Sequence, residues 1–296
     1  MRIIDQFNKE LCLKIKPKSI LFGQNITTGS RIAGMTNNIE KLNNVETINT
    51  QNSESSLIGF GFGLMLSKVN SLYLAKQLDF ILLGMDHIVN TLNFLAPQKI
   101  KFSFSVITYI VDSGYEGPQS RLNCLSEIAS MSKSCCRYLV FPGDIKYSLK
   151  KINNGGFNLL CLSQKYSREI FNPKLISKDK KGDTFKYSSG KDYTFVAVGF
   201  AAYEVYKIIL NNPKYYSVDF FVITNPINFE KKELIKSIKK TKNAYFFDQS
   251  KSELKSLNEL ENLITSLKNN IKLKKFYNKD SIKKLYVNTD RYKLNV

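Results

Sequence analysis

Short apolar runs alternate with segments of helical periodicity along most of this chain, and this alternation constrains the fold more than any other feature. Runs of this length that are rich in β-branched and aromatic residues predict strands. They cover residues 18–22, 71–74, 101–110, 137–141, 157–162, 193–198, 218–223 and 244–248. Strands separated by helices are typical of a mainly parallel sheet that is covered by helices. The sequence therefore predicts an α/β fold.

The segment that begins at Phe80 shows the clearest helical pattern. Its apolar residues recur at spacings of four and three, which marks one face of an amphipathic helix. These residues are Ile81, Met85, Ile88, Leu92 and Leu95, and Pro97 follows them as a stop signal. Further helices are expected over residues 55–66, 144–152, 201–210, 232–239 and 250–268.

A polar stretch divides the chain into two parts. Residues 163–192 contain Pro173, several lysines and two glycines, a composition that is typical of a linker. The length of 296 residues corresponds to about two domains, at roughly 150 residues for each. We expect a first domain over residues 1–165, a linker over 166–192 and a second domain over 193–296.

The charge of the chain could indicate a nucleic-acid partner, because 44 Lys and Arg against 25 Asp and Glu give +19. The lysines are spread along the chain, however, and the densest stretches, 231–242 and 268–293, are punctuated by acidic and apolar residues at helical spacing. This pattern is typical of a solvated lysine face and argues against nucleic acid as the partner.

The sequence also predicts a compartment. Its apolar runs are shorter than the roughly 20 residues that a membrane span needs, and no signal peptide is visible at the start. The five cysteines are irregularly spaced without a CxxC pair, and His87 is the only histidine, so a zinc cluster is not expected. We expect a cytoplasmic protein in a reducing compartment, without a membrane partner or a structural metal.

The segment Ser53-Glu54-Ser55-Ser56 lies just before an apolar helix. Taken alone it predicts a helix N-terminus, where a carboxylate contributes roughly 0.3–1 kcal/mol. The glycines that follow, at positions 59, 61 and 63, do not have the GxGxxG spacing of a dinucleotide site. The pair Gly59 and Gly63 instead predicts close packing of this helix against a neighbour.

Longer motifs give this segment a context. In order along the chain they are GQNITTGSRIAGMT (23–36), ETINTQNSESSLIGFGFGLML (46–66), LDFILLGMDHIVN (78–90), GYEGPQS (114–120) and YLVFPGDIKYSLKKI (138–152). At these spacings they resemble the beta subunit of the thiamine-diphosphate-dependent 2-oxo acid dehydrogenases of the pyruvate dehydrogenase type. The second half is similar to the transketolase C-terminal domain. The resemblance implies a pyrimidine-binding-type domain followed by a transketolase C-terminal-type α/β domain, within the transketolase-like superfamily.

The resemblance also implies roles for individual residues. Glu54 matches the family's catalytic glutamate, which contacts N1′ of the cofactor's aminopyrimidine ring and thereby assists proton transfer. Phe80 matches the aromatic residue that packs on the same ring, although without this context it could equally be a core residue at a strand-to-helix junction. Asp86, His87 and Asn90 are expected to be structural or interface residues.

One family residue is missing. The family carries a histidine within "G-P-x-H-S-Q", and the matching stretch here is Gly117-Pro118-Gln119-Ser120-Arg121. Gln119, Ser120 and Asn123 are therefore the candidates for substrate contact. They are neutral hydrogen-bonding residues, and none can shuttle a proton near neutral pH as histidine does.

The resemblance implies that the site is shared between two chains. The family's GDG and Asn-Asn motif, which binds the diphosphate and Mg²⁺, belongs to the alpha chain, and this sequence has no GDG. We expect thiamine diphosphate bound together with an alpha-type partner that holds Mg²⁺, in an α2β2 assembly, with a homodimer as the other option.

The expected activity is cleavage of a 2-oxo acid or a ketose next to its carbonyl. A specialised transketolase-like enzyme of sugar or secondary-metabolite synthesis is one alternative. A degenerate beta-type subunit that only scaffolds its partner is another, because the family histidine is absent.

Overall fold

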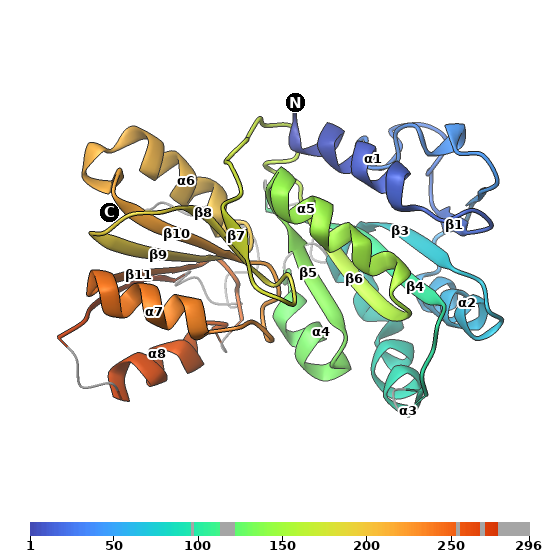
Figure 1. Cartoon of the computed structure of the whole chain (residues 1–296). Helices are drawn as coiled ribbons and strands as arrows, with labels where there is room; N and C mark the ends of the chain where they lie inside the picture. Colours follow the sequence, from blue (N-terminus) through green and yellow to red (C-terminus); the bar gives the residue numbers. More distant parts are fainter. Residues whose placement is uncertain (96–97, 113–121, 253–254, 267–269, 278–296) are drawn as a thin grey trace.

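Two six-stranded sheets lie side by side in the chain (Figure 1). This computed structural model describes residues 1–95, 98–112, 122–252, 255–266 and 270–277. The N-terminal half forms the first sheet and the C-terminal half forms the second, and each sheet has helices on both faces. The arrangement confirms the predicted α/β fold.

The first sheet is parallel throughout, with the order β2-β1-β3-β4-β6-β5. Its strands are β1 (Ile20–Gly23), β2 (Glu46–Asn49), β3 (Ser71–Gln77), β4 (Ser103–Ile110), β5 (Cys135–Leu139) and β6 (Gly156–Ser163). β4 is buried at every position, and a strand buried on both faces reads as a continuous apolar run. β2 was not predicted, because it is only four residues long and has no fully buried position.

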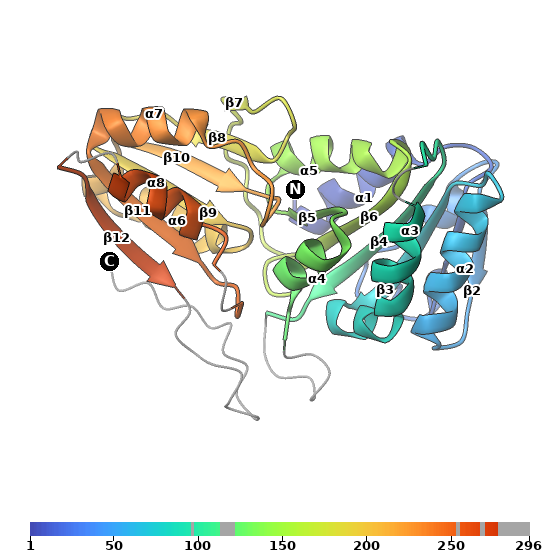
Figure 2. The same cartoon turned by 90° about the horizontal axis from the view of Figure 1, so that it is seen from below.

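The helices of the first sheet divide between its two faces. On one face lie α1 (Ile3–Lys14) and α5 (Pro142–Ser148), and on the other lie α2 (Glu54–Leu66), α3 (Leu92–Leu95) and α4 (Leu125–Ser132) (Figures 1 and 2). Short 3-10 turns cover Ile39–Lys41 and Leu149–Asn153. α1 and α4 were not predicted from the sequence.

The helix α1 is tied to the far end of the first domain. The side-chain amide of Asn153 donates to the carbonyl of Lys14 at 2.7 Å. The backbone N–H of Ile3 donates to the carbonyl of Glu169 at 3.0 Å, and that of Ile4 to the carbonyl of Ser167 at 2.8 Å. The start of α1 is therefore held against residues that follow β6, the strand that ends at Ser163.

The helix predicted from Phe80 to Leu95 is not a regular α-helix. Leu78–Gly84 forms a 3-10 helix, His87–Thr91 is π-helical and only the last four residues form α3. A Cβ on Gly84 would lie 2.3 Å from the Cδ1 atom of Ile58, so this segment presses closely against α2. The buried face was nevertheless predicted correctly at several positions, including Ile88.

The second sheet has the order β12-β11-β9-β10-β8-β7. Its strands are β7 (Ser177–Lys178), β8 (Thr184–Ser188), β9 (Tyr193–Val198), β10 (Val218–Ile223), β11 (Asn243–Asp248) and β12 (Lys272–Tyr277). β9 to β12 are parallel, and β8 and β7 add an antiparallel edge. One face carries α6 (Ala201–Asn211), followed by a 3-10 turn at Pro213–Tyr215, and the other carries α7 (Lys232–Thr241) and α8 (Asn258–Ser266).

Two sequence predictions differ from this sheet. The stretch 166–192, predicted to be a linker, contains β7 and β8, which are part of the second sheet. The helix predicted over 250–268 begins only at Asn258. The carboxylate of Asp248 accepts hydrogen bonds from the backbone N–H groups of Ser250 at 2.8 Å and Ser256 at 3.2 Å, which ties both residues to the end of β11.

The two sheets meet at a buried contact region that we call the inter-sheet seam, formed by Tyr138, Val140, Asp144, Tyr187, Gly199, Tyr203 and Thr224. The backbone N–H of Tyr138 donates to the carbonyl of Thr224 at 2.9 Å. The hydroxyl of Tyr203 donates to the carbonyl of Val140 at 2.5 Å. These contacts join the first sheet directly to the second.

Asp144 is the polar centre of the inter-sheet seam. Its carboxylate accepts from the backbone N–H groups of Val140 and Phe141, at 2.8 and 2.7 Å, and from the hydroxyl of Tyr187 at 2.8 Å. Burial raises the pKa of Asp144 to about 7, although these hydrogen bonds oppose the rise. Gly199 allows the closest approach, since a Cβ there would lie 2.7 Å from the Tyr138 ring.

The five cysteines form no disulfide. Within the described ranges, no helix has both the length and the apolar character that a membrane span requires.

Candidate functional site

The carboxyl edge of the first sheet contains a topological switch point. The chain leaves β1 for β2 on one side and returns to β3 on the other side of β1. In open α/β sheets, ligands bind at such points, outside the carboxyl ends of the strands. Glu54 follows the end of β2 and Phe80 follows the end of β3. The structure therefore places both predicted cofactor-binding residues at this edge.

The backbone at the switch point is tightly held. Gly23 ends β1 with φ +151°, and a Cβ there would lie 2.3 Å from the carbonyl oxygen of Leu74. The backbone N–H of Thr50 donates to the carbonyl of Gly23 at 3.0 Å. The amide group of Asn49 donates to the hydroxyl of Thr27 at 2.5 Å and accepts from its backbone N–H at 3.2 Å. The loops after β1 and β2 thus form one connected frame.

Glu54 is the first residue of α2, and its side chain is half-buried. Tyr73 of β3 has a raised pKa, mainly because it is buried and also because the negative charge of Glu54 acts on it. The carboxylate of Glu54 therefore lies close to β3. The nearby hydroxyl of Thr50 is buried and has no hydrogen-bond partner in the described part of the chain. The carboxylate of Glu54 and the hydroxyl of Thr50, which has no partner among the described residues, are therefore close in sequence at this edge of the sheet.

Phe80 lies in the 3-10 helix after β3. Its side chain is half-exposed, whereas its neighbours Leu78 and Ile81 are buried in the core. An aromatic face at the carboxyl edge can pack against a flat ring. The position thus differs from that of an ordinary core phenylalanine.

The predicted substrate-contacting residues are only partly described. Gln119 and Ser120 lie outside the described residues. Asn123 is buried, and its side-chain amide donates to the carbonyl of Val111 at 3.0 Å and accepts from the backbone N–H of that residue at 3.2 Å. These bonds fix the chain after β4, so Asn123 supports the edge of the sheet.

Asp79 is a residue that the sequence analysis missed. It is buried, and its carboxylate accepts from the backbone N–H groups of Leu122 at 2.7 Å and Asn123 at 2.8 Å. The carboxylate therefore links the end of β3 to the residues just before α4. An acidic residue directly after an apolar strand was the signal that could have identified it.

His87, Asp86 and Asn90 make local contacts. The amide of Asn90 donates to the carboxylate of Asp86 at 2.7 Å. A Cβ on Gly59 would lie 2.9 Å from Nε2 of His87, so the predicted close packing at Gly59 is confirmed. A Cβ on Gly63, in contrast, would meet no described atom within 4 Å and would face open space, so close packing at Gly63 was predicted wrongly.

The outer side of α2 is apolar. Residues 57–66 include no polar side chain, although a helix that is apolar all round is normally buried. Phe60 is 44% exposed and Leu66 is 50% exposed, and Leu83 of the adjoining 3-10 helix is 59% exposed. We call this surface, formed by Phe60, Gly63, Leu66 and Leu83, the apolar α2 face. Exposed apolar patches of this kind mark interaction sites.

Metal-ligating side chains do not gather at this edge or elsewhere in the part of the chain that the structure describes. No group of three or more His, Cys, Asp or Glu side chains there could hold a metal ion.

Comparison with solved structures identifies a protein of similar fold. No protein-family model and no curated protein sequence matches this chain. A split-gene transketolase, solved as an inactive beta4 tetramer, is similar in structure, with a TM-score of 0.66 at 13% identity over 96% of this chain and 91% of that chain. At this identity the likeness concerns the fold alone, and it does not single out the pyruvate dehydrogenase beta subunit. The chain therefore has a transketolase-type fold.

Proposed function

We propose that this chain is the beta-type subunit of a heteromeric thiamine-diphosphate-dependent enzyme that cleaves a 2-oxo acid or a ketose next to its carbonyl. The observation that carries the proposal is the position of Glu54, a half-buried carboxylate at the switch point of a parallel sheet. The transketolase-type fold is compatible with it.

The residues at the carboxyl edge fit the pyrimidine half of the cofactor. Glu54 would accept a hydrogen bond from the aminopyrimidine ring and hold a proton at that ring nitrogen. Phe80 would offer its half-exposed ring to the face of the pyrimidine, and Thr50 has a hydroxyl without a partner among the described residues. Bound thiamine diphosphate supplies the carbanion chemistry that the side chains of a protein lack.

A partner chain would complete the site. We expect an alpha-type subunit with the GDG and Asn-Asn motif to hold the diphosphate and Mg²⁺. The apolar α2 face supports this expectation, because α2 begins at Glu54 and leaves Phe60 and Leu66 exposed. The similar solved structure comes from a split-gene transketolase, which also supports a divided enzyme, in an α2β2 arrangement or as a homodimer.

The products of the reaction distinguish a ketose substrate from a 2-oxo acid substrate. The structural likeness to a transketolase favours a ketose substrate, and with it a specialised transketolase-like enzyme of sugar or secondary-metabolite synthesis. Release of an aldehyde or a ketol would support that branch. Transfer of an acyl group to a lipoyl carrier would instead support the 2-oxo acid branch.

The decisive experiment uses the assembled enzyme. The full chain is purified with its associated protein, which mass spectrometry identifies, and bound thiamine diphosphate is assayed. Glu54→Gln should lower turnover by roughly 100-fold or more, because acid–base catalysis contributes about that much. Glu46→Gln is the matched control, since Glu46 is exposed at the start of β2. Full activity in Glu54→Gln would overturn the proposal.

A non-catalytic scaffold subunit is the second candidate. The observation that favours it is the position of the sole histidine, His87, which packs against Gly59. Under this reading the chain still assembles with a partner. Glu54→Gln would then change neither turnover nor the amount of bound cofactor.

A further inference from the structure

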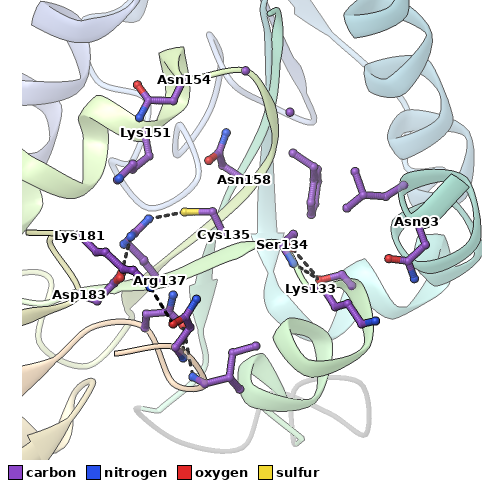
Figure 3. Close-up of a pocket in the computed structure, with 18 residues that line it drawn as sticks. Asn93, Lys133, Ser134, Cys135, Arg137, Lys151, Asn154, Asn158, Lys181 and Asp183 are labelled. Carbon is purple, nitrogen blue, oxygen red and sulfur yellow. Dashed lines mark hydrogen bonds and ion pairs between the residues drawn. The ribbon is translucent and has the colours of Figure 1, made fainter. Parts of the chain in front are cut away.

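A cleft of about 530 Å³ opens between the two sheets at the amino edge of the first sheet (Figure 3). Cys135 and Gly156, which begin β5 and β6, line one side, and Asp183 and Asn225, which flank β8 and β10, line the other. Glu54 follows the carboxyl end of β2, so it belongs to the opposite edge. Small-molecule sites have volumes of roughly 300–1,000 Å³.

The charge of this cleft is unbalanced. Among the described residues, its lining includes four cationic side chains, Lys133, Arg137, Lys151 and Lys181, and one carboxylate, that of Asp183. Four positive charges against one negative charge leave an excess of three. Like charges in a cleft with protein walls repel more strongly than in open water. The lining is therefore complementary to an anion.

Arg137 provides buried positive charge in the wall of the cleft. Its residue is only 3% exposed. The guanidinium donates to the carboxylate of Asp183 and to the thiol of Cys135, while its Nε atom has no hydrogen-bond partner among the described residues. Burial raises the pKa of the Cys135 thiol, and the positive charges of Arg137 and Lys151 oppose that rise. The positive charges of Arg137 and Lys151 therefore both lie close to Cys135.

The rest of the lining is mostly polar and uncharged. Asparagine side chains predominate, and Asn158 is 3% exposed and hydrogen-bonds to Ser105 at 3.3 Å. The other asparagines are Asn93, Asn154, Asn225 and Asn228. Amide groups donate and accept, as the hydroxyl groups of a ligand require.

We propose that this cleft binds a small metabolite that carries a phosphate group. Arg137, Lys151 and Lys181 would surround the phosphate, because guanidinium and ammonium groups form short, charge-assisted hydrogen bonds with it. The asparagine amides would bind the hydroxyl groups. Lys151 precedes β6 of the first sheet and Lys181 precedes β8 of the second, so the ligand would bridge the two sheets.

The first test measures binding to the full chain without a partner or thiamine diphosphate. Isothermal titration calorimetry at fixed ionic strength compares three probes: glycerol 3-phosphate, inorganic phosphate and glycerol. We expect saturable binding of glycerol 3-phosphate, weaker binding of inorganic phosphate and none of glycerol. Equal affinity for the two phosphates would overturn the metabolite proposal in favour of free phosphate, and absence of binding would overturn it entirely.

Variants then locate the binding site. Lys151→Gln and Lys181→Gln should each weaken glycerol 3-phosphate binding by about tenfold, because each removes a charged hydrogen bond. Lys150→Gln and Lys180→Gln are matched controls, since they are sequence neighbours that do not line this cleft. Equal affinity in all four variants would overturn the proposed location. Because no partner or cofactor is present, this outcome is independent of the role of Glu54.

Discussion

The inter-sheet seam and the apolar α2 face differ in one respect. In the seam, polar groups find hydrogen-bond partners within the chain, whereas on the α2 face apolar side chains are left exposed. In the inter-sheet seam, Asp144 accepts three hydrogen bonds and the hydroxyl of Tyr203 reaches the carbonyl of Val140. On the apolar α2 face, Phe60 and Leu66 remain about half exposed. The chain thus joins its two sheets with its own hydrogen bonds, whereas apolar side chains of α2 remain exposed to solvent.

The largest expected effect concerns the apolar α2 face. Leu66→Asp should weaken assembly with a partner chain by roughly 1,000-fold, or about 4 kcal/mol, because it buries an unpaired charge. Leu210→Asp is the control, since Leu210 is 55% exposed on α6 and Leu66 is 50% exposed on α2. Sedimentation velocity of the mixed subunits measures both. Equal assembly of the two variants would show that α2 is not the interface.

The next prediction concerns pH and the inter-sheet seam. The pKa of Asp144 is raised to about 7, whereas an unfolded aspartate titrates near roughly 3.9. Between these values the folded chain binds more protons than the unfolded chain. The free energy of unfolding should therefore fall as the pH rises from about 4 to about 7, by up to about 1.4 kcal/mol per pH unit.

Urea denaturation across this pH range tests the effect. The slope of unfolding free energy against pH should be smaller in Asp144→Asn, and unchanged in Asp192→Asn, where the side chain is exposed. The asparagine accepts fewer hydrogen bonds than the carboxylate, so the overall stability also falls and the slope is the relevant quantity. A slope identical to that of the parent chain would contradict the assignment to Asp144.

A smaller effect is expected at Gly199. Its φ is +54°, and a Cβ would lie 2.7 Å from the Tyr138 ring. Gly199→Ala should cost about 2–4 kcal/mol of stability, from backbone strain and overpacking together. Gly182→Ala separates the two causes, because φ is +70° there but the nearest atom is 4.0 Å away. Equal losses in thermal denaturation would rule out a steric contribution from the inter-sheet seam.

The smallest effect is expected at Gly63. Gly63→Ala should stabilise the separate chain by about 0.5–1 kcal/mol, because alanine favours a helix interior and nothing lies within 4 Å. The same change should weaken assembly, since the added methyl group keeps a partner helix away. Gly61→Ala should instead destabilise the chain, because its Cβ would lie 2.2 Å from the Phe104 ring. Unchanged assembly in Gly63→Ala would argue against the apolar α2 face as an interface.

The strands show which parts of the fold the sequence could predict. β9 and β10 were predicted at their observed bounds, because they are buried at nearly every position and read as continuous apolar runs. β12 was missed because lysines occupy much of this exposed edge strand. α1 carried a usable signal, since Ile3, Phe7 and Leu11 recur at spacings of four.

The two candidate sites also differ in whether the sequence could predict them. Glu54 and Phe80 could be proposed from the sequence, because both belong to an ordered series of motifs that resembles a known family. The cleft at the amino edge could not. Lys151 lies in the predicted first domain and Lys181 in the predicted linker, and only the packing of the two sheets brings them to one cleft.

The closure of α1 on the end of its own domain has a consequence for synthesis on the ribosome. The N–H of Ile3 donates to the carbonyl of Glu169, so the contacts of α1 are complete only after the chain has grown past that residue. At 5–20 residues per second, this takes roughly 10–30 s. During that time the apolar side of α1, including Phe7 and Leu11, is open to chaperones. α1 therefore completes its contacts later than its position in the chain would suggest.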